Sequence, residues 1–163
     1  MTRITRVGAM VFAFCAFMLV AAIAVPVATA DKPVKEPSPS DDFTIPASIC
    51  GFEVMVEILT DKGKAITFGD GRTMISGALK VRLTNSDDPT SSIVLNISGP
   101  GTFEASGVLT ATGPWLFFFL PGELGAGSPP ILAYTKGQVL IDDTGFHLLG
   151  GTRIDLCPVL ASM

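Results

Sequence analysis

Apolar and polar residues alternate along much of the chain after residue 50. In residues 52–58 every second side chain is large and apolar, and glutamates occupy two of the positions between them. The apolar set is Phe52, Val54, Val56 and Ile58, and the glutamates are Glu53 and Glu57. A period of two places the two sets on opposite sides of an extended strand. The same alternation recurs in 72–84, and 131–141 and 146–156 are also predicted to be strands, so the pattern predicts a β-rich fold.

Short polar and glycine-containing segments separate the alternating stretches. Asp70-Gly71 is a strong hairpin signal, and the segment 142–145 resembles a type I turn that ends on a glycine. Within 72–84, Gly77 occupies an inward position and indicates a bulge or a sharp bend, because glycine has no side chain to pack. Proline and glycine recur too often for a convincing helix. About eight short strands, joined mostly by tight turns, give an antiparallel meander.

The first thirty residues follow a different pattern. Arg3 and Arg6 precede an almost unbroken apolar run over 7–27, and Ala28-Thr29-Ala30 follows it. This order predicts a signal peptide over 1–30, and therefore a secreted protein without stable membrane insertion after cleavage. The alternative is a membrane anchor, because about 20 apolar residues can span a bilayer.

The composition changes again over residues 31–49, which hold four prolines, three serines and few large apolar side chains. Such a segment cannot bury enough apolar surface to offset the entropy of ordering it, so it is predicted to be a flexible spacer. The folded part then covers residues 50–160. About 110 residues is an ordinary size for a single β domain.

Two cysteines, Cys50 and Cys157, remain after cleavage, and disulfides persist in exported proteins. An intramolecular bridge would hold the two ends of the domain within about 7 Å of each other at their Cα atoms. Two free thiols and an intermolecular bridge are the alternatives. Tying the ends of a meander together favours an all-β fold, an antiparallel barrel of about eight strands that has no exposed edges. A two-layer β-sandwich satisfies the same constraint.

Cleavage would leave an acidic chain. Loss of Arg3 and Arg6 leaves 9 of the 11 basic residues against all 15 acidic ones, a net charge near −6. Nucleic acid and anionic lipid both attract clustered Lys and Arg, so this balance argues against either as a partner.

No set of residues predicts a catalytic site, a cofactor or a metal. His147 is the only histidine, which excludes a multi-histidine metal centre, and it lies between Phe146 and Leu148 in an expected strand. Neither a G-x-S-x-G elbow nor a glycine-rich phosphate loop occurs. An enzyme is therefore the least favoured class of function.

The segment 115–120, WLFFFL, is the least polar window after residue 30. On a strand, Trp115, Phe117 and Phe119 face one side, whereas Leu116, Phe118 and Leu120 face the other. Both faces are apolar, so both should be covered. Three interpretations follow: a central strand covered by 31–49 or by 121–130, a subunit interface in a homo-oligomer, or the lining of a site for a small apolar ligand.

Several short segments resemble a group of small secreted actinobacterial proteins, an uncharacterised family with a domain of unknown function. The segments are 50–52, 83–85, 96–101, 113–119 and 155–157. The resemblance covers most of the mature chain and implies export and a shared fold, without an activity or catalytic residues to transfer. Three function classes remain: an extracellular module that binds a small apolar ligand or partner, a structural or self-associating envelope protein, and a small barrel enzyme of the cyclase or isomerase type.

Overall fold

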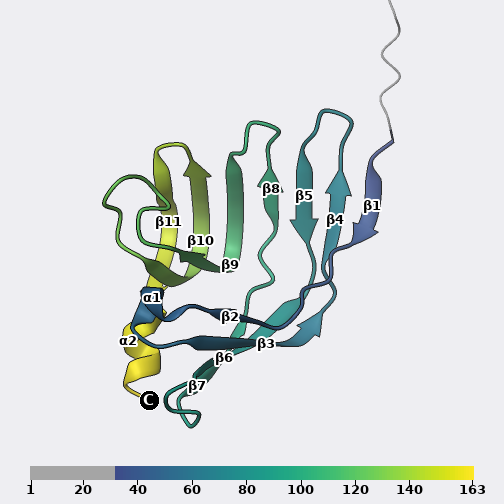
Figure 1. Cartoon of the computed structure of the whole chain (residues 1–163). Helices are drawn as coiled ribbons and strands as arrows, with labels where there is room; N and C mark the ends of the chain where they lie inside the picture. Colours follow the sequence, from purple (N-terminus) through teal and green to yellow (C-terminus); the bar gives the residue numbers. More distant parts are fainter. Residues whose placement is uncertain (1–31) are drawn as a thin grey trace, which may run out of the picture.

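Antiparallel strands in two sheets make up most of the structure, a computed structural model that describes residues 32–163 (Figure 1). The seven-stranded sheet contains, in spatial order, β1 (Val34–Pro37), β4 (Lys64–Thr67), β5 (Thr73–Ser76), β8 (Gly101–Phe103), β9 (Leu109–Phe119), β10 (Ile131–Asp142) and β11 (Gly145–Asp155). The four-stranded sheet contains β2 (Phe43–Ile45), β3 (Val54–Asp61), β6 (Leu79–Asn85) and β7 (Ser92–Asn96). Two short helices, α1 (Ala47–Cys50) and α2 (Leu156–Ala161), lie at one end.

The chain crosses between the sheets four times, and this gives the fold its shape. The pairs β1–β2, β3–β4, β5–β6 and β7–β8 each place one strand in either sheet, and the spatial order of the four pairs is the same in both. Each pair is therefore one long strand that bends midway. Figure 1 shows the upper halves upright in the larger sheet and the lower halves running across beneath it. We call 38–42, 62–63, 77–78 and 97–100 the crossing segments.

Gly77 makes one of these bends possible. Its φ is +144°, a conformation that favours glycine, and a Cβ there would lie 2.3 Å from the carbonyl oxygen of Lys62. The neighbouring crossing segment is hydrogen-bonded to this bend, because the Lys62 amide donates to the carbonyl of Ala78. The segment 72–84, expected as one strand with a bend at Gly77, is thus β5 and β6 on either side of that bend.

The predicted closed barrel is wrong, and the two-layer alternative describes the arrangement. In the larger sheet β1 and β11 are the two edges and do not pair with each other. The bends redirect the lower halves of four strands into a second layer, where their apolar sides pack on β9 and β10. The buried set of this main core is Ile45, Ile49, Val54, Val56, Val81, Leu83, Leu95, Leu132, Tyr134, Leu156 and Leu160.

The disulfide between Cys50 and Cys157 is confirmed, with a Cα–Cα distance of 5.0 Å across 107 residues. It joins α1 to α2 rather than two strands. These helices were not expected, because each is too short to show a helical period. Asp155 begins α2 by accepting the amide hydrogen of Cys157, and Leu156 and Leu160 then share one buried face.

The segment expected to be a spacer contributes β1, β2 and α1. Backbone pairing needs no apolar side chains, so β1 joins β4 over four residues although its own side chains are exposed. In β2, Ile45 is fully buried against β3. The signal peptide predicted for 1–30 lies outside the described residues. Within 32–163 no helix has the length and apolar character needed to cross a bilayer.

Candidate functional site

The aromatic residues predicted on β9 separate onto its two faces. Trp115, Phe117 and Phe119 form a stacked row with ring centroids 5.6 and 6.3 Å apart, and Phe146 of β11 packs edge-on against Phe117 at 5.3 Å. Phe117 is 7% exposed in this second apolar cluster, which also contains Leu109, Ala111 and Val139. The row is therefore largely a packing feature of the larger sheet.

Phe118 lies on the opposite face, where the main core ends. Its ring is 5.7 Å from that of Phe43 in β2, and 41% of the side chain is exposed. Leu116, two residues earlier on the same face, packs into the main core. The cover of this face thus comes from β2, a strand within the expected spacer.

Trp115 extends from the stacked row toward the crossing segment 97–100. A Cβ built at Gly99 would lie 2.2 Å from the indole Nε1, and one at Gly101 would lie 2.6 Å from the ring. The indole N–H donates to the carbonyl of Thr112 at 3.2 Å, which orients the ring. These glycines are required by the close approach of the indole, and they bring Trp115 to the edge of a recess.

The recess has a volume of about 240 Å³ and lies where the four crossing segments meet. Its apolar walls come from Ile75, Leu79, Ile97, Trp115 and Leu116. Its remaining lining is small or polar: Ser38, Ser40, Asp61, Gly63, Ser76, Gly77, Ser98 and Gly99. Every crossing contributes to this lining, so the bends that divide the sheets also create the recess.

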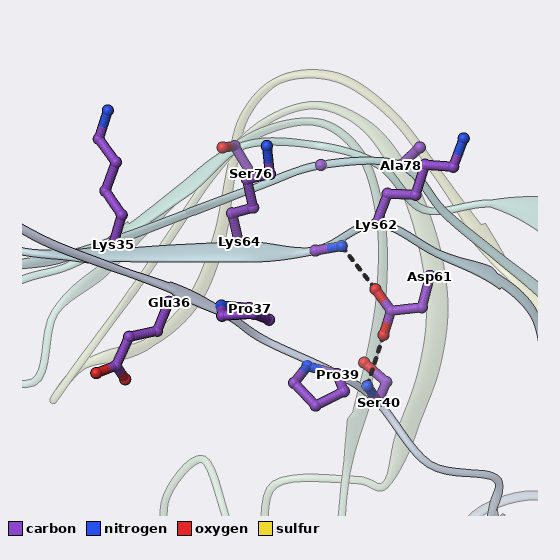
Figure 2. Close-up of a pocket in the computed structure, with 12 residues that line it drawn as sticks. Lys35, Glu36, Pro37, Pro39, Ser40, Asp61, Lys62, Lys64, Ser76 and Ala78 are labelled. Atoms are coloured by element: carbon purple, nitrogen blue, oxygen red, sulfur yellow. Dashed lines mark hydrogen bonds between the residues drawn. The ribbon is translucent and has the colours of Figure 1, made fainter.

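A wider, shallower cleft of about 940 Å³ adjoins the recess. The two parts share five lining residues: Ser40, Asp61, Gly63, Ser76 and Gly77. Three lysines form the rim of the wider part: Lys35 of β1, Lys62 of the crossing segment between β3 and β4, and Lys64 of β4. Figure 2 shows their side chains rising on the same side. We call the two parts together the crossing cleft. Neither part is lined by a histidine or a cysteine.

Asp61 organises the floor of the crossing cleft. Its carboxylate accepts the amide hydrogens of Gly63 at 2.7 Å and of Ser40 at 2.6 Å, the two bonds drawn in Figure 2. These hydrogen bonds, that of Gly63 above all, lower the pKa of Asp61 from its ordinary value, against a smaller opposing effect of burial. A further bond from the Ser38 amide to the carbonyl of Gly63 ties the first crossing to the second. Asp61 thus links the first and second crossing segments at the floor of the cleft.

The charged residues in the lining of the crossing cleft are three lysines and two acids, Glu36 and Asp61. The ion pairs within residues 32–163 are Arg72–Asp70, Arg82–Glu57 and His147–Asp142, and none involves Lys35, Lys62 or Lys64. Glu36 also lines the cleft, but Figure 2 shows its carboxylate directed away from the side on which the lysines rise. The rim therefore carries positive charge that no nearby acid pairs with.

His147 lies away from the cleft, beside the turn between β10 and β11. Its Nε2 is 2.8 Å from the Thr144 hydroxyl and 3.3 Å from an oxygen of Asp142. The Thr144 hydroxyl and amide also lower the pKa of Asp142. All three side chains serve one exposed turn. Within the described part of the chain no group of three or more His, Cys, Asp or Glu residues is placed to hold a metal ion.

Of the four aromatic residues predicted as a ligand site or interface, only Trp115 lines the crossing cleft, and Phe117, Phe118 and Phe119 pack elsewhere. Cys50 and Cys157 tie the helices. The residues that the sequence analysis missed are those of the rim and floor. Lys35 fell within the expected spacer, and Asp61, Lys62 and Lys64 lie in one of the short polar, glycine-containing segments between alternating stretches. The sequence shows only that Lys62 and Lys64 are two residues apart. Their proximity to Lys35 and Ser76 depends on strand pairing, which no local pattern reveals.

Comparison with known proteins adds no relative: no protein-family model, no curated protein and no solved structure matches this chain.

Proposed function

We propose that this protein is an exported binding module that holds the apolar part of a small ligand in the crossing cleft. The observation that supports it is the recess, whose walls are apolar and whose opening leads into the wider cleft. Sites for small molecules are typically concave and mostly apolar, with a few placed polar groups. The recess has this character, because apolar residues line it together with four serines and one aspartate.

The size of the recess limits what it accepts. Its 240 Å³ falls below the range of about 300–1,000 Å³ that encloses a drug-sized ligand. It accommodates an alkyl chain or a single ring, with the rest of the ligand in the wider cleft. Each methylene taken from water contributes about 0.8 kcal/mol, so a short chain offsets the entropic cost of association only modestly. We therefore expect binding in the micromolar to millimolar range.

Trp115 provides the measurement, because it is the only tryptophan in the chain and it lines the recess. Titration of the mature protein with 1-octanol should produce a saturable change in tryptophan fluorescence. Ser76→Phe, which places a ring in the cleft, should abolish that change.

Thr84→Phe is the matched control, because Thr84 lies on β6 outside the cleft and Phe is equally suited to a strand. Octanol binding that is absent from the native protein, or equal in Ser76→Phe and Thr84→Phe, would contradict the proposal.

Export is part of the same proposal and rests on the residue pattern of 1–30. Cleavage after Ala30 would yield a chain that begins at Asp31. The intact mass of the protein from the culture medium should match residues 31–163. A mass that includes Cys15, or recovery only from the membrane fraction, would favour the membrane-anchored alternative.

A second candidate function, self-association, is supported by β11. This strand forms an edge of the larger sheet, is eleven residues long and exposes Leu148, Leu149 and Ile154. The other edges are shorter: β1 carries Lys35 and Pro37, and β2 and β7 have three and five residues. Long apolar edges pair with other chains unless they are blocked. Two features of β11 oppose such pairing, a bulge at Leu149 and the exposed charge of Arg153.

Sedimentation velocity separates this candidate from a monomeric binding module. If β11 pairs with a second copy, Leu149→Lys should shift the protein to monomer at micromolar concentration. Met55→Lys is the control, because Met55 is similarly exposed, at 54% against 57% for Leu149, but lies on the central strand β3. A monomeric native protein would exclude self-association through this edge.

A further inference from the structure

The three lysines at the rim of the crossing cleft are brought together by strand pairing. In the β1–β4 register Pro37 lies opposite Lys64, and Lys35 is two residues from Pro37 on the same strand. Residues two apart share a face, so Lys35 and Lys64 are diagonal neighbours, with about 7–8 Å between such positions. Lys62 precedes Lys64 by two residues and lines the same part of the cleft.

Positive charge collects here although the chain as a whole is acidic, with 15 acidic and 11 basic residues. None of the three amino groups has an ion-pair partner within the described residues. The two acids in the lining form no ion pair with them: Asp61 is charged but hydrogen-bonds two backbone amides, and the carboxylate of Glu36 is directed away from the lysines (Figure 2). An anion bound at this rim would therefore meet three lysines that have no ion-pair partner of their own.

The positively charged rim and the apolar recess share part of their lining. The rim and the recess share Ser40, Asp61, Gly63, Ser76 and Gly77, so a chain lying in the recess would emerge beside the lysines. Ser76 pairs directly with Lys64 across β4 and β5, and Leu79, an apolar wall, follows on the next strand. The recess and the positive rim therefore meet at Ser76 and at the other lining residues that they share.

From this arrangement we infer that the ligand of the crossing cleft is a small anionic amphiphile, with an alkyl chain in the recess and a single anionic headgroup at the rim that Lys35, Lys62 and Lys64 form. The inference rests on the proposed function and specifies its ligand class. Lysine ammonium groups act as point charges, so carboxylate and phosphate headgroups meet the same requirement. The soluble, monomeric form of such an amphiphile is the ligand proposed, rather than a membrane surface.

The test compares ligands that share one chain and differ in headgroup: octanoate, 1-octanol and octylammonium, each titrated at neutral pH and followed through Trp115 fluorescence. Octanoate should bind at least about tenfold more tightly than octanol in 20 mM salt, because each exposed lysine contributes roughly two- to fivefold. Octylammonium should bind more weakly than octanol. Raising the salt to 0.5 M should remove most of the octanoate advantage, because it screens exposed charges.

Lys35→Gln/Lys62→Gln/Lys64→Gln should remove the advantage of octanoate over octanol, so that the two ligands bind with similar affinity. Lys80→Gln is the control for a single substitution, compared with Lys64→Gln, because Lys80 is also exposed but lies on β6 outside the cleft. Lys64→Gln should weaken octanoate binding two- to fivefold, and Lys80→Gln should leave it unchanged.

The outcomes separate the inference from the proposed function. Equal binding of octanoate and octanol, insensitive to salt and to the triple substitution, overturns the inference and leaves the binding module intact. Absence of binding by all three probes overturns both. Sedimentation with vesicles of anionic phospholipid, without binding of monomeric octanoate, overturns the inference in favour of a membrane surface.

Discussion

Trp115 shows how one side chain constrains a distant stretch of backbone. Its indole occupies the space where Gly99 and Gly101 would carry a Cβ, so a glycine in the crossing segment 97–100 and another at the start of β8 are needed for it to lie there. Gly99 has no positive φ, and the requirement there is purely one of space. Gly150 is a useful contrast, because nothing lies within 4 Å of its Cβ position and its φ is also not positive.

Gly99→Ala should therefore lower the free energy of unfolding by about 1–3 kcal/mol, the usual cost of forcing extra atoms into a packed site. Gly150→Ala should stay within about 0.5 kcal/mol of the native protein. Urea unfolding followed by Trp115 fluorescence measures both. Similar stabilities for the two variants would show that the indole does not lie on Gly99.

Asp61 gives the floor of the cleft a dependence on pH. Its pKa lies below the ordinary value because the carboxylate accepts two backbone amides, so the folded state favours the charged form. The stabilisation is complete above the unfolded pKa and is lost as the pH falls through the lowered folded value.

An NMR titration should find the pKa of the Asp61 carboxyl below that of an unstructured aspartate. The amide shifts of Ser40 and Gly63 should follow the same titration. In Asp61→Asn, which has no proton to release, those two amides should lose this pH dependence. A carboxyl that titrates normally, with amides that do not respond, would mean that the Asp61 bonds are absent in solution.

Strand β9 separates two apolar clusters, and its consecutive phenylalanines have unequal surroundings. Phe117 is enclosed by Trp115, Phe119 and Phe146, whereas Phe118 has one aromatic neighbour, Phe43, and is 41% exposed. The two residues are adjacent and chemically identical, so a difference in stability reports their surroundings alone.

Phe117→Ala should cost about 3–5 kcal/mol, as expected for a buried ring that leaves a cavity. Phe118→Ala should cost about 1–2 kcal/mol, because only part of that ring leaves water on folding. Chemical unfolding of each variant provides the values.

A double-mutant cycle with Phe43→Ala should show a coupling of about 0.5–1.5 kcal/mol for Phe118 and none for Phe117. Equal losses of stability for the two phenylalanine substitutions, or no coupling to Phe43, would show that β2 does not pack on Phe118.

The disulfide constrains the molecule as a whole. It closes a loop of 107 residues and joins the two helices that cover one end of the main core. The same helix α2 is also held by side chains from the β6–β7 region, because Asn85 donates to the carbonyl of Leu160 and the Ser91 hydroxyl does so as well. The bridge therefore reinforces contacts that exist without it.

Replacing both cysteines, Cys50→Ser/Cys157→Ser, should reduce the free energy of unfolding by about 2–5 kcal/mol, chiefly by enlarging the unfolded ensemble. The native protein under reducing conditions should lose the same amount, and the variant should not respond to reductant. Equal melting temperatures with and without reductant would show that the bridge contributes nothing.

Much of the fold could be predicted from local patterns. The alternation over 54–58 predicts which side chains of β3 are buried, the bend at Gly77 and the hairpin at Asp70-Gly71 occur where the turn residues indicate, and the disulfide pairs the expected cysteines. These features depend on the period of a strand, on the φ values that glycine permits and on a count of two cysteines. Neighbouring residues therefore carry all the information they need.

The remaining features depend on contacts between distant segments. Residues 34–45 form β1 and β2 because backbone edges elsewhere offer them partners, and no side-chain pattern within 31–49 encodes that. A closed barrel and a two-layer arrangement would contain the same hairpins. The bends at the four crossing segments decide between the two folds. The crossing cleft draws its lining from residues as far apart as Lys35 and Leu116, so their proximity exists only once the strands have paired and bent.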